Sequence, residues 1–566
     1  MIVHDAARAE AFHAKGWWFE ETINDLFRAS VRRNPEGLAL ADAPNREDFT
    51  TGSPRRLTYA QTDAAVSALA GRMAARGVGK DDVVAAQLPN IVESVLVLLA
   101  CARLGAVYSP LLPQFDENEL KPILANLRPR LFLTVSRFKK RDLSEAPIRL
   151  SEGGDCQVVV LDRLDDPDAW WAPDAESETA LAEALAQGRA CADDVFTVCW
   201  TSGTEGEPKG AMRTHNNWRW TGQIMIDSAG MRPDDVILNT RPLVNMAAIG
   251  GSVMPWVMGG GALILHSPMD VGLVIQQIRD EAVNVTFMPP AFFISLLQDE
   301  ALRASADLSS LRVMGTGSAA IPGWVIGRME TEFGVQIINF FGSNEGMSLL
   351  SSPADTPNPE HRGAYFPRLG DPRFDWPALP QSVQITGRLV DVDSGETIDE
   401  PGRPGELRMS SPSIFGGYHG RSDLTAAAFD ADGFLKTGDL FEIAGQGELA
   451  RYYRFVGRCK DIIVRGGLKI APAELDELLS QHPGIKEAAT YAIADPRLGE
   501  KVAVAVAPHV PGSVSLADII QFLKDRRVAV FKLPEHMIEL DTLPRNALQK
   551  VMRRELSQLD PLGRGA

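Results

Sequence analysis

The segment TSGTEGEPKG, residues 201–210, concentrates groups that bind anions. Its glycines let backbone N–H groups approach a ligand closely, its hydroxyls add donors, and its lysine adds a positive charge. These residues are Gly203, Gly206 and Gly210, then Thr201, Ser202 and Thr204, and finally Lys209. A solvated surface turn is the commoner fate of a loop rich in Gly, Ser and Thr. Taken alone, the segment supports a phosphate site and a surface turn equally.

The segment is a poor match to the phosphate loop of Walker-type kinases and GTPases. That loop has the pattern G-x-x-x-x-G-K-[ST]. When the pattern starts at Gly203, Pro208 stands where it needs glycine, and Gly210 stands where it needs Ser or Thr. A phosphate site in this segment would therefore belong to another class of protein.

Four later segments follow the first one in a recognisable order. They are NFFGSNEG (339–346), GFLKTGDL (433–440), GRCKDIIVRGGLKIAPAELDELL (457–479) and LPRNALQKVMRRE (543–555). With 201–210, they resemble the motifs of the AMP-forming adenylating superfamily, in its acyl- and aryl-CoA ligase branch. The sequence looks similar to dihydroxybenzoate-AMP ligases and to aromatic or alicyclic acid–CoA ligases, and the resemblance covers nearly the whole chain.

The resemblance implies a reaction in two steps. A carboxylate attacks the α-phosphorus of ATP to give an acyl-adenylate and pyrophosphate, and a thiolate then displaces AMP. Because the first step brings an anion to a polyanion, positioning and charge neutralisation carry most of the catalysis. ATP, Mg2+ and coenzyme A are the implied substrates and cofactors, together with a small carboxylic acid.

The resemblance also implies a role for particular residues. Lys550 is expected to reach the α-phosphate and the attacking carboxylate, and Lys209 the β- and γ-phosphates. Glu345, a hard oxygen donor, is the expected Mg2+ ligand. Asp439 is expected to accept from the ribose hydroxyls, with Arg458 beside it. The other implied nucleotide contacts are Thr201, Ser202, Gly203, Thr204, Gly206, Gly317, Ser318, Asn339, Phe341 (stacked on adenine), Gly342 and Asn344.

Each of these side chains also has an ordinary structural interpretation. An isolated glutamate or lysine is most often solvated surface, which would apply to Glu345 and Lys550. Phe341 alone would be assigned to the core, and Asp439 alone to a turn. Only the motif context favours the functional interpretation.

The resemblance also implies residues for a hinge, for the path of the thiol and for the pocket that binds the acid. Lys460 matches the hinge at which a C-terminal domain rotates between the steps. Gly466 and Gly467 would let the pantetheine arm pass close to backbone, although a glycine pair often forms only a turn. The implied pocket is apolar with little charge, which favours a neutral ring or a medium chain over a dicarboxylate. Its positions are Asn245, Met246, Ile249, Gly315, Thr316, Gly317 and Met347.

The sequence departs from the family pattern at a few positions. Asn344 stands where threonine is usual, and Asn245 or Val244 stands where many members carry histidine. In the lysine segment, Asn546 and Gln549 replace threonine and glycine, which predicts a stiffer loop. None of these changes removes a charge that the mechanism needs, so activity is expected.

The elements that must position these residues follow an α/β pattern. Short β-branched runs alternate with helical patterns through the first 350 residues, which predicts mainly parallel sheets covered by helices. Segment 201–210 is expected at the carboxyl end of a strand, in a loop leading to a helix. Strand patterns from about 383 to 457 predict an antiparallel, β-rich subdomain. The predicted domains are an AMP-binding domain at 1–459 and a small mobile α+β lid at 460–566.

Composition limits the other classes. A net charge of −17 argues against a protein that coats nucleic acid. The uncharged stretch 242–265 is long enough to span a membrane, but Pro255 and several glycines interrupt it, so a buried helix, a turn and the strand ALIL are expected. The cysteines have no metal or disulfide spacing, which predicts buried free thiols in a reducing cytosol. They are Cys101, Cys156, Cys191, Cys199 and Cys459.

The expected protein is thus a cytoplasmic enzyme without an export signal, a monomer or a homodimer. Coenzyme A is the favoured thiol acceptor because no carrier domain is fused within 566 residues. Two alternatives stay open. One is an enzyme that loads a free-standing carrier protein, and the other is a homologue that binds nucleotide without chemistry.

Overall fold

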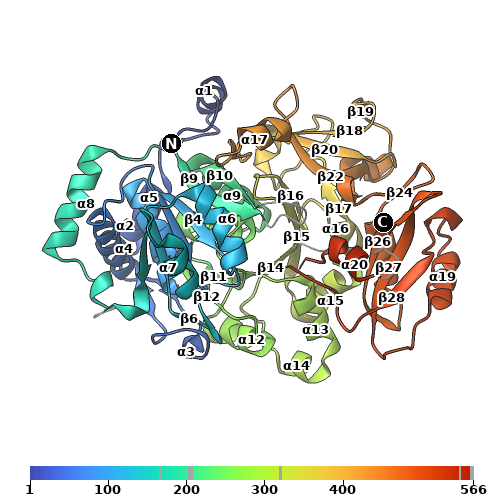
Figure 1. Ribbon diagram of the computed structural model, residues 1–566, viewed down its shortest axis with the longest axis horizontal. Helices are drawn as coiled ribbons and strands as arrows, with labels where there is room; N and C mark the ends of the chain where they lie inside the picture. Colours follow the sequence, from blue (N-terminus) through green and yellow to red (C-terminus); the bar gives the residue numbers. More distant parts are fainter. Residues whose placement is uncertain (165–167, 202–207, 318–320, 547–549, 561–566) are drawn as a thin grey trace. The chain divides into compact units, whose positions relative to one another are not determined.

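The computed structural model describes residues 1–164, 168–201, 208–317, 321–546 and 550–560. The chain forms two compact units (Figure 1). Unit 1 comprises 1–201, 208–386 and 410–435, and unit 2 comprises 387–409 and the described residues from 436 onward. The hinge at Lys460 stays a prediction. The positions predicted at Ser202, Gly203, Thr204, Gly206, Ser318 and Gln549 lie outside the described residues.

Unit 1 contains the first of two large α/β sheets. All its internal strand pairs are parallel except the two at its edges, β15–β16 and β1–β2. Its order is β16 (Ser348–Ser351), β15 (Gln336–Gly342), β14 (Val313–Gly317), β13 (Val285–Phe287), β11 (Val236–Asn239), β12 (Ala262–Leu265), β1 (Leu38–Ala41) and β2 (Arg56–Thr58). The predicted parallel α/β class is confirmed.

The second sheet of unit 1 is parallel on one side and antiparallel on the other. Strands β4, β3, β5 and β8 run parallel to β9, whereas β10 is antiparallel both to β9 and to β21. The order is β21 (Gly417–Tyr418), β10 (Lys209–Thr214), β9 (Val195–Thr201), β4 (Val107–Leu111), β3 (Val83–Gln87), β5 (Leu131–Thr134) and β8 (Gln157–Val160).

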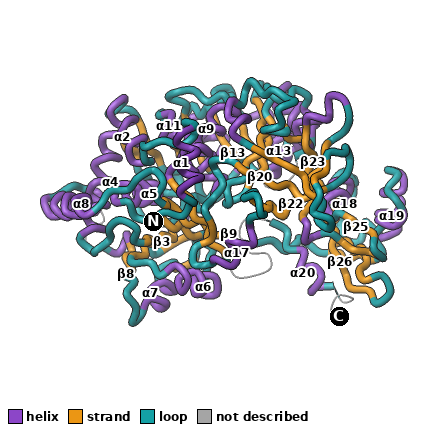
Figure 2. Tube along the Cα trace, turned by 90° about the horizontal axis from the view of Figure 1, so that it is seen from above, coloured by secondary structure: helices purple, strands orange, loops and turns teal. Residues whose placement is uncertain are grey.

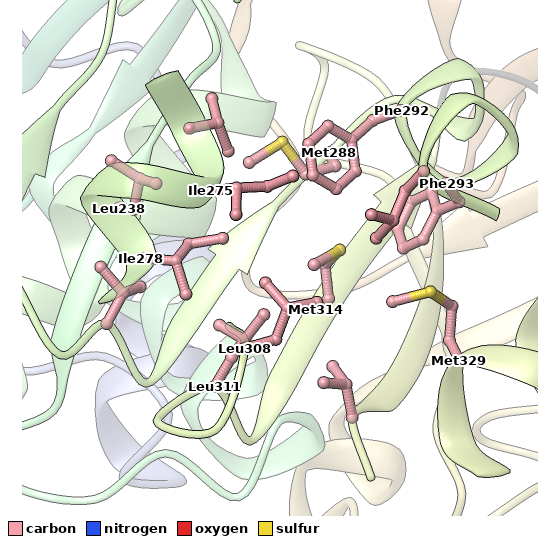
Figure 3. Packing of buried hydrophobic residues seen from close by; sticks show 14 of the residues in the cluster. Leu238, Ile275, Ile278, Met288, Phe292, Phe293, Leu308, Leu311, Met314 and Met329 are labelled. Atoms are coloured by element: carbon pink, nitrogen blue, oxygen red, sulfur yellow. The ribbon is translucent and has the colours of Figure 1, made fainter. Parts of the chain in front are cut away.

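Helices cover the first sheet because their apolar residues recur at helical spacing. Figure 3 shows side chains of α12 (Val271–Asp280), α13 (Pro290–Gln298) and α15 (Gly323–Phe333) packed with Leu238 and Met314 of the strands. The helix α9 (His215–Ser228), the π-helix η3 (Ile249–Val253) and α11 (Met254–Gly259) pack together, and η3 also contacts β11 and β13. The predicted buried helix, turn and ALIL strand at 242–265 are thereby confirmed.

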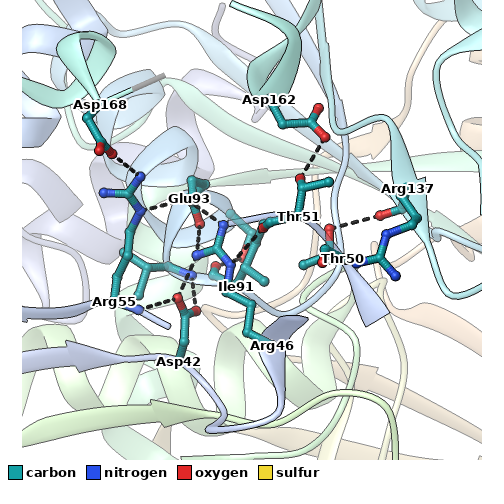
Figure 4. A network of polar contacts seen from close by, with 12 residues as sticks. Asp42, Arg46, Thr50, Thr51, Arg55, Ile91, Glu93, Arg137, Asp162 and Asp168 are labelled. Carbon is teal, nitrogen blue, oxygen red and sulfur yellow. Dashed lines mark hydrogen bonds and ion pairs between the residues drawn. The ribbon is translucent and has the colours of Figure 1, made fainter. Parts of the chain in front are cut away.

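Helix α5 (Val92–Leu104) is buried along its whole length. It packs against α4 (Tyr59–Ala74), which in turn packs against α8 (Ala175–Gln187), as Figure 2 shows. An apolar helix that is buried all round tolerates charges only when they are paired. Its buried glutamate, Glu93, accepts from both Arg46 and Arg55, and Asp42 joins the same network (Figure 4).

The Asp42 carboxyl gives this network a pH dependence. Burial, followed by the charge of Glu93, raises the pKa of Asp42 to about 6. The folded pKa of Asp42 lies above its unfolded value, so protonation of Asp42 favours the folded state. This contribution to the free energy of unfolding is complete at low pH and is lost as the pH rises through about 6. Asp42→Asn lacks this titration, so its free energy of unfolding relative to wild type is expected to rise between about pH 4 and pH 6. Urea unfolding of both proteins across that range tests this, and a pH-independent difference would contradict it.

Unit 2 contains two smaller sheets. The first includes β18 (Thr386–Val390), β19 (Thr397–Ile398), β20 (Gly405–Ser410), β22 (Leu435–Ile443) and β23 (Tyr452–Arg458), and its β18–β19 and β22–β23 pairs are antiparallel. This confirms the β-rich subdomain. The second has the order β25 (Leu468–Ile470), β24 (Ile463–Arg465), β27 (Gly499–Pro508) and β26 (Ile485–Asp495), with β28 (His536–Glu539) on β27. Helices α18 (Pro472–Leu479), α19 (Leu516–Asp525) and α20 (Arg553–Leu559) complete it.

Two expectations about the whole chain are also tested by the structure. Among the described helices, none is both long and apolar enough to cross a membrane. The five cysteines are free, but only Cys101 and Cys199 are buried, and Cys191 is exposed. The prediction of buried thiols was therefore confirmed for Cys101 and Cys199 and wrong for Cys191, which follows α8 in an exposed connection, while Cys156 and Cys459 are half-buried.

Candidate nucleotide and acid site

Lys209 is the first residue of a strand. It pairs with Thr201 across the antiparallel β9–β10 ladder, and the Thr201 hydroxyl lies 3.4 Å from the Lys209 carbonyl oxygen. The prediction that segment 201–210 leads into a helix was wrong, because β10 intervenes before α9 begins. The segment therefore ends in a strand that begins with Lys209, and not at a helix N-terminus.

Strand β21 brings a tyrosine beside this lysine. Tyr418 pairs with Ala211 of β10, and the Lys209 ammonium lies 5.5 Å from the centre of the Tyr418 ring. The Tyr418 ring also packs edge-on against Phe415 at 4.8 Å between ring centres. An ammonium at this distance from an aromatic ring is attracted by the ring's quadrupole.

Glu345 lies in the turn between β15 and β16. Its carboxylate oxygen Oε1 accepts from the Tyr418 hydroxyl at 2.8 Å, and its backbone oxygen accepts from the Phe415 N–H, also at 2.8 Å. Burial, followed by the charge of Glu345, raises the pKa of Tyr418. The adjacent Gly346 has φ +100°, and a Cβ there would lie 2.0 Å from the Ser413 carbonyl, so only glycine fits this turn.

The carboxylate of Glu345 fits a magnesium ion that arrives with a nucleotide. Its Oε1 is bonded to Tyr418, and no hydrogen bond from a described residue reaches its Oε2. The described part of the chain holds no group of three or more His, Cys, Asp or Glu side chains suited to a metal ion. Mg2+ usually binds through one or two carboxylates together with substrate phosphates and waters, so a single glutamate suits it.

Asn344 joins two parts of the candidate site. Its amide nitrogen donates to the Trp200 carbonyl at 3.2 Å, and its amide oxygen accepts from the Met246 N–H at 3.0 Å. It therefore ties the end of β9 to the short helix α10 (Met246–Ala248). The replacement of the family's threonine thus gains a structural role, and its contact with phosphate stays a prediction.

A buried arginine supports the segment on which Glu345 rests. Arg213 of β10 is fully buried, and its Nη2 donates to the Thr221 hydroxyl at 2.6 Å and to the Ser413 carbonyl at 3.2 Å. The Ser413 hydroxyl donates to the Gly346 carbonyl at 2.6 Å. Burial lowers the pKa of Arg213 to about 9, with Glu345 acting in the opposite direction. Arg213 thus connects α9 to the Glu345 turn.

The positions predicted for the adenine lie along β14 and β15. Phe341 is partly exposed, and its ring meets Phe366 edge-on at 5.8 Å. The buried Asn339 donates to the carbonyls of Arg362 and Gly363, both at 3.1 Å. The same strands therefore carry the predicted base contacts, but stacking of Phe341 on adenine stays a prediction.

A phenylalanine fills the space beside the predicted acid-pocket residue Gly315. A Cβ on Gly315 would lie 2.2 Å from the Phe287 ring, and a Cβ on Gly251 would lie 3.7 Å from it. The Phe287 ring is 4% exposed and packs at 5.3 Å from the ring of Phe340. The Phe287 ring therefore lies in a slot between β14 and the π-helix η3. The slot is open to the ring because Gly315 and Gly251, which line it, have no side chains.

The other predicted pocket positions differ in orientation. The side-chain oxygen of Asn245 accepts from the N–H groups of Ala247 and Ala248 and so caps α10. This oxygen is therefore already used and is not available to bind an acid. Ile249 and Met347 are buried. Thr316 is buried, and by strand alternation it shares the face of Met314 rather than that of Gly315, so its place in the pocket stays a prediction.

In unit 2, the two residues predicted for the ribose lie together. Asp439 and Arg458 are register partners in the β22–β23 ladder, and Arg458 Nε lies 3.3 Å from Asp439 Oδ1. Lys460, at the predicted hinge, is exposed in a single 3-10 turn. Gly466 and Gly467 form the tip of the β24–β25 hairpin with φ +57° and +83°, values that favour glycine in a two-residue hairpin turn.

Lys550 is exposed, and its backbone is held by a residue of the same segment. Its N–H donates to Asn546 Oδ1 at 3.0 Å, and its carbonyl accepts from the Asn546 N–H at 2.9 Å. The asparagine that replaces the family's threonine thus bonds directly to the backbone of Lys550. The stiffer loop expected from the sequence stays a prediction.

Of the residues that the sequence analysis named, Lys209, Glu345 and Asn344 lie in one region of unit 1. Asp439 and Arg458 lie together in unit 2. It missed Tyr418, Arg213 and Phe287. Arg213 carried no signal in the sequence, because KGAMRT (209–214) has no strand pattern that would mark this arginine as buried. Tyr418 and Phe287 lie in none of the recognised motifs, so no pattern in the sequence pointed to them.

Comparisons with known proteins agree with this arrangement. The sequence profile described as AMP-binding enzyme matches residues 27–419, and the one described as AMP-binding enzyme C-terminal domain matches 474–550. The chain is 30% identical to a medium-chain fatty-acid–CoA ligase of Escherichia coli, covering 98% of this chain and 93% of that protein. It is 31% identical to an indoleacetate–CoA ligase of Aromatoleum aromaticum, covering 89% and 93%. The structure of ATP-bound MatB from Rhodopseudomonas palustris matches with a TM-score of 0.79 at 25% identity, over 95% of this chain and 99% of that one.

Proposed function

Because this chain belongs to the AMP-binding enzyme family, we propose that it joins an apolar carboxylic acid to coenzyme A through an acyl-adenylate. It is an ATP-dependent acid–thiol ligase of the AMP-forming type. In the first step a carboxylate oxygen bonds to the α-phosphorus and pyrophosphate leaves. In the second step a thiolate bonds to the acyl carbon and AMP leaves.

One observation carries the proposal of an ATP site in unit 1. Lys209 and Glu345 come from distant parts of the sequence and both contact Tyr418. A cation for the β- and γ-phosphates and a carboxylate for Mg2+ are the two charges that bound ATP requires. Bound Mg2+ would neutralise part of the phosphate charge, and Glu345 would hold it.

The remaining roles rest on the family resemblance. Asp439 and Arg458 would bind the ribose, and their pairing across β22 and β23 supports that assignment. Lys550 would stabilise charge on the α-phosphate. Rotation at Lys460 would then replace the lysine segment with the hairpin of Gly466 and Gly467, which would admit the thiol of coenzyme A. The shift from one step to the other would also limit loss of the acyl-adenylate to water.

The chemistry of the acid pocket supports an uncharged ring or medium chain behind the carboxylate. The slot around Phe287 is formed by Gly251, Gly315 and Phe340, with Met225 next to Gly251. None of these residues can pair with a second carboxylate, and leaving one unpaired in an apolar site is costly. Methionine adapts its shape to irregular apolar ligands, so several related acids are expected as substrates.

Phe287 is expected to limit the size of the acid. Phe287→Leu should shift the preference toward longer or bulkier acids by roughly tenfold in relative kcat/KM, since a few methylenes in an apolar pocket carry that discrimination. Gly251→Ala adds a methyl group 3.7 Å from the ring and should shift the preference toward smaller acids. Kinetics with a graded series of straight-chain and aryl acids measures both.

A second buried phenylalanine provides the control for this test. Phe293 of α13 is fully buried on the opposite face of the sheet, so Phe293→Leu should lower stability without changing the order of preferred acids. Identical acid profiles for Phe287→Leu and wild type would exclude Phe287 from the pocket.

The function is tested by a panel of acids with ATP and Mg2+, followed by AMP and pyrophosphate release. Coenzyme A and a holo carrier protein are supplied in parallel, and the thioester is identified on each. AMP formation with the thioester on coenzyme A is expected. If the thioester forms on the carrier protein alone, the enzyme loads a carrier protein. If no acid of the panel gives AMP, the chain is a nucleotide-binding protein without this chemistry.

The free thiols support a cytoplasmic location, which localisation of the tagged chain would test.

A further inference from the structure

Tyr418 contacts the two charged residues of the candidate phosphate site at once. Its hydroxyl donates to Glu345 Oε1 at 2.8 Å, and its ring lies 5.5 Å from the Lys209 ammonium. Within the described residues, Lys209 and Glu345 form no ion pair with each other or with another side chain. Both charged side chains therefore contact the same tyrosine.

The tyrosine is held firmly in this place. Its backbone is paired with Ala211 of β10, and its N–H donates to the Thr425 hydroxyl at 2.9 Å. Its ring packs edge-on against Phe415, whose own N–H holds the Glu345 backbone. Tyr418 is 8% exposed, so movement of the ring would disturb several packed neighbours. The geometry thus fixes the tyrosine relative to β10 and to the backbone of Glu345.

A direct pair between Lys209 and Glu345 would weaken the site for ATP. Each charge would be neutralised before the nucleotide arrived, and binding would have to break the pair first. A phenol bonded to one carboxylate oxygen leaves the negative charge on the carboxylate and orients it, as hydrogen bonds to metal ligands commonly do. A ring facing an ammonium likewise leaves its positive charge in place.

We propose that Tyr418 is a positioning residue for the phosphate and magnesium groups of bound ATP. It orients Glu345 through one oxygen, so that the other oxygen is left for Mg2+, and it keeps Lys209 from pairing with that carboxylate. This inference rests on the proposed function for the identity of the ligand, Mg2+·ATP.

Two substitutions separate the two roles. Tyr418→Phe removes the hydroxyl and keeps the ring beside Lys209, so it should raise the Mg2+ concentration needed for half-maximal ATP binding by roughly tenfold. At saturating Mg2+, this variant should bind ATP as wild type does. Tyr418→Leu removes the ring as well, which lets Lys209 pair with Glu345, so ATP binding should stay weaker even at saturating Mg2+.

Tyr59→Phe is the matched control. Tyr59 is buried to 1% exposure in α4, and its hydroxyl donates to the Gly261 carbonyl at 3.0 Å. The variant thus also loses one hydroxyl and one hydrogen bond from a buried tyrosine. It should lower the thermal midpoint and leave the Mg2+ requirement unchanged, which is the outcome expected of a purely structural tyrosine.

The test is calorimetric titration of ATP into each protein at a series of Mg2+ concentrations, without acid or thiol. Titration of Mn2+ in the presence of ATP, followed by its electron spin resonance, gives the cation affinity directly. A Tyr418→Phe protein with the Mg2+ requirement of wild type and Tyr59→Phe would overturn the inference. If wild type binds Mg2+·ATP with the expected shift in Tyr418→Phe but activates no acid, the proposed function fails and the role of Tyr418 stands.

Discussion

Lys550→Ala is expected to slow formation of the acyl-adenylate by roughly 10²–10³-fold, the usual cost of removing one group that stabilises charge in a transition state. The same protein should convert supplied acyl-adenylate and coenzyme A to the thioester at the wild-type rate. The reason is that the proposed rotation at Lys460 would move the lysine segment away from the α-phosphate before the thiolate attacks, so Lys550 would act in the first step only. Stopped-time assays of each half-reaction measure both rates.

The control for this prediction is another exposed lysine of unit 2. Lys524 lies in the last turn of α19, and Lys524→Ala should leave both half-reactions unchanged. Equal losses in the two half-reactions of Lys550→Ala would mean that the substitution disturbs the domain as a whole. Normal adenylation would mean that Lys550 is misassigned.

Arg46→Met is expected to destabilise the protein by about 3–5 kcal/mol, because it leaves the buried Asp42 carboxylate without its cation and leaves Glu93 with Arg55 alone. Arg46 donates to Asp42 Oδ2 at 2.6 Å and to both oxygens of Glu93, at 2.8 and 2.9 Å. The side chains of Asp42 and Glu93 are 0% and 4% exposed, so water cannot replace these bonds. Urea unfolding at neutral pH gives the change in free energy.

An exposed arginine provides the matched control. Arg56 forms a similar two-pronged contact with Glu281, but its side chain is 53% exposed. Arg56→Met should therefore cost at most about 1 kcal/mol. Comparable losses for the two variants would show that burial of the Arg46 network is not the source of its stability.

Much of the fold of unit 1 could be predicted because its strands are short β-branched runs separated by helical patterns. The segments VFTVCW and VQIINFFG became β9 and β15, and IPGWVIGRMETEF became α15. Strand β10 could not be predicted, because KGAMRT has no strand pattern of its own and is ordered by its ladder with β9. The loop before it was therefore assigned to the wrong kind of connection.

The site could be predicted only where a residue belongs to a recognised motif. Lys209 and Glu345 were found in this way, but Tyr418 meets Glu345 across 73 positions of sequence through a two-residue strand. Phe287 could not be found either, because its slot exists only where Gly251 of the π-helix and Gly315 of β14 come together. Such contacts depend on tertiary packing, which no local pattern encodes.

The central claim, that a carboxylate attacks the α-phosphorus of ATP, is tested most directly by isotope transfer. An acid labelled with 18O in both carboxylate oxygens is converted with ATP, Mg2+ and coenzyme A, and the products are analysed by mass spectrometry. The account predicts one 18O atom in AMP and none in pyrophosphate, because the attacking oxygen stays on the α-phosphorus when the thiolate takes the acyl group. Label in inorganic phosphate with ADP as the nucleotide product, or unlabelled AMP, would contradict it.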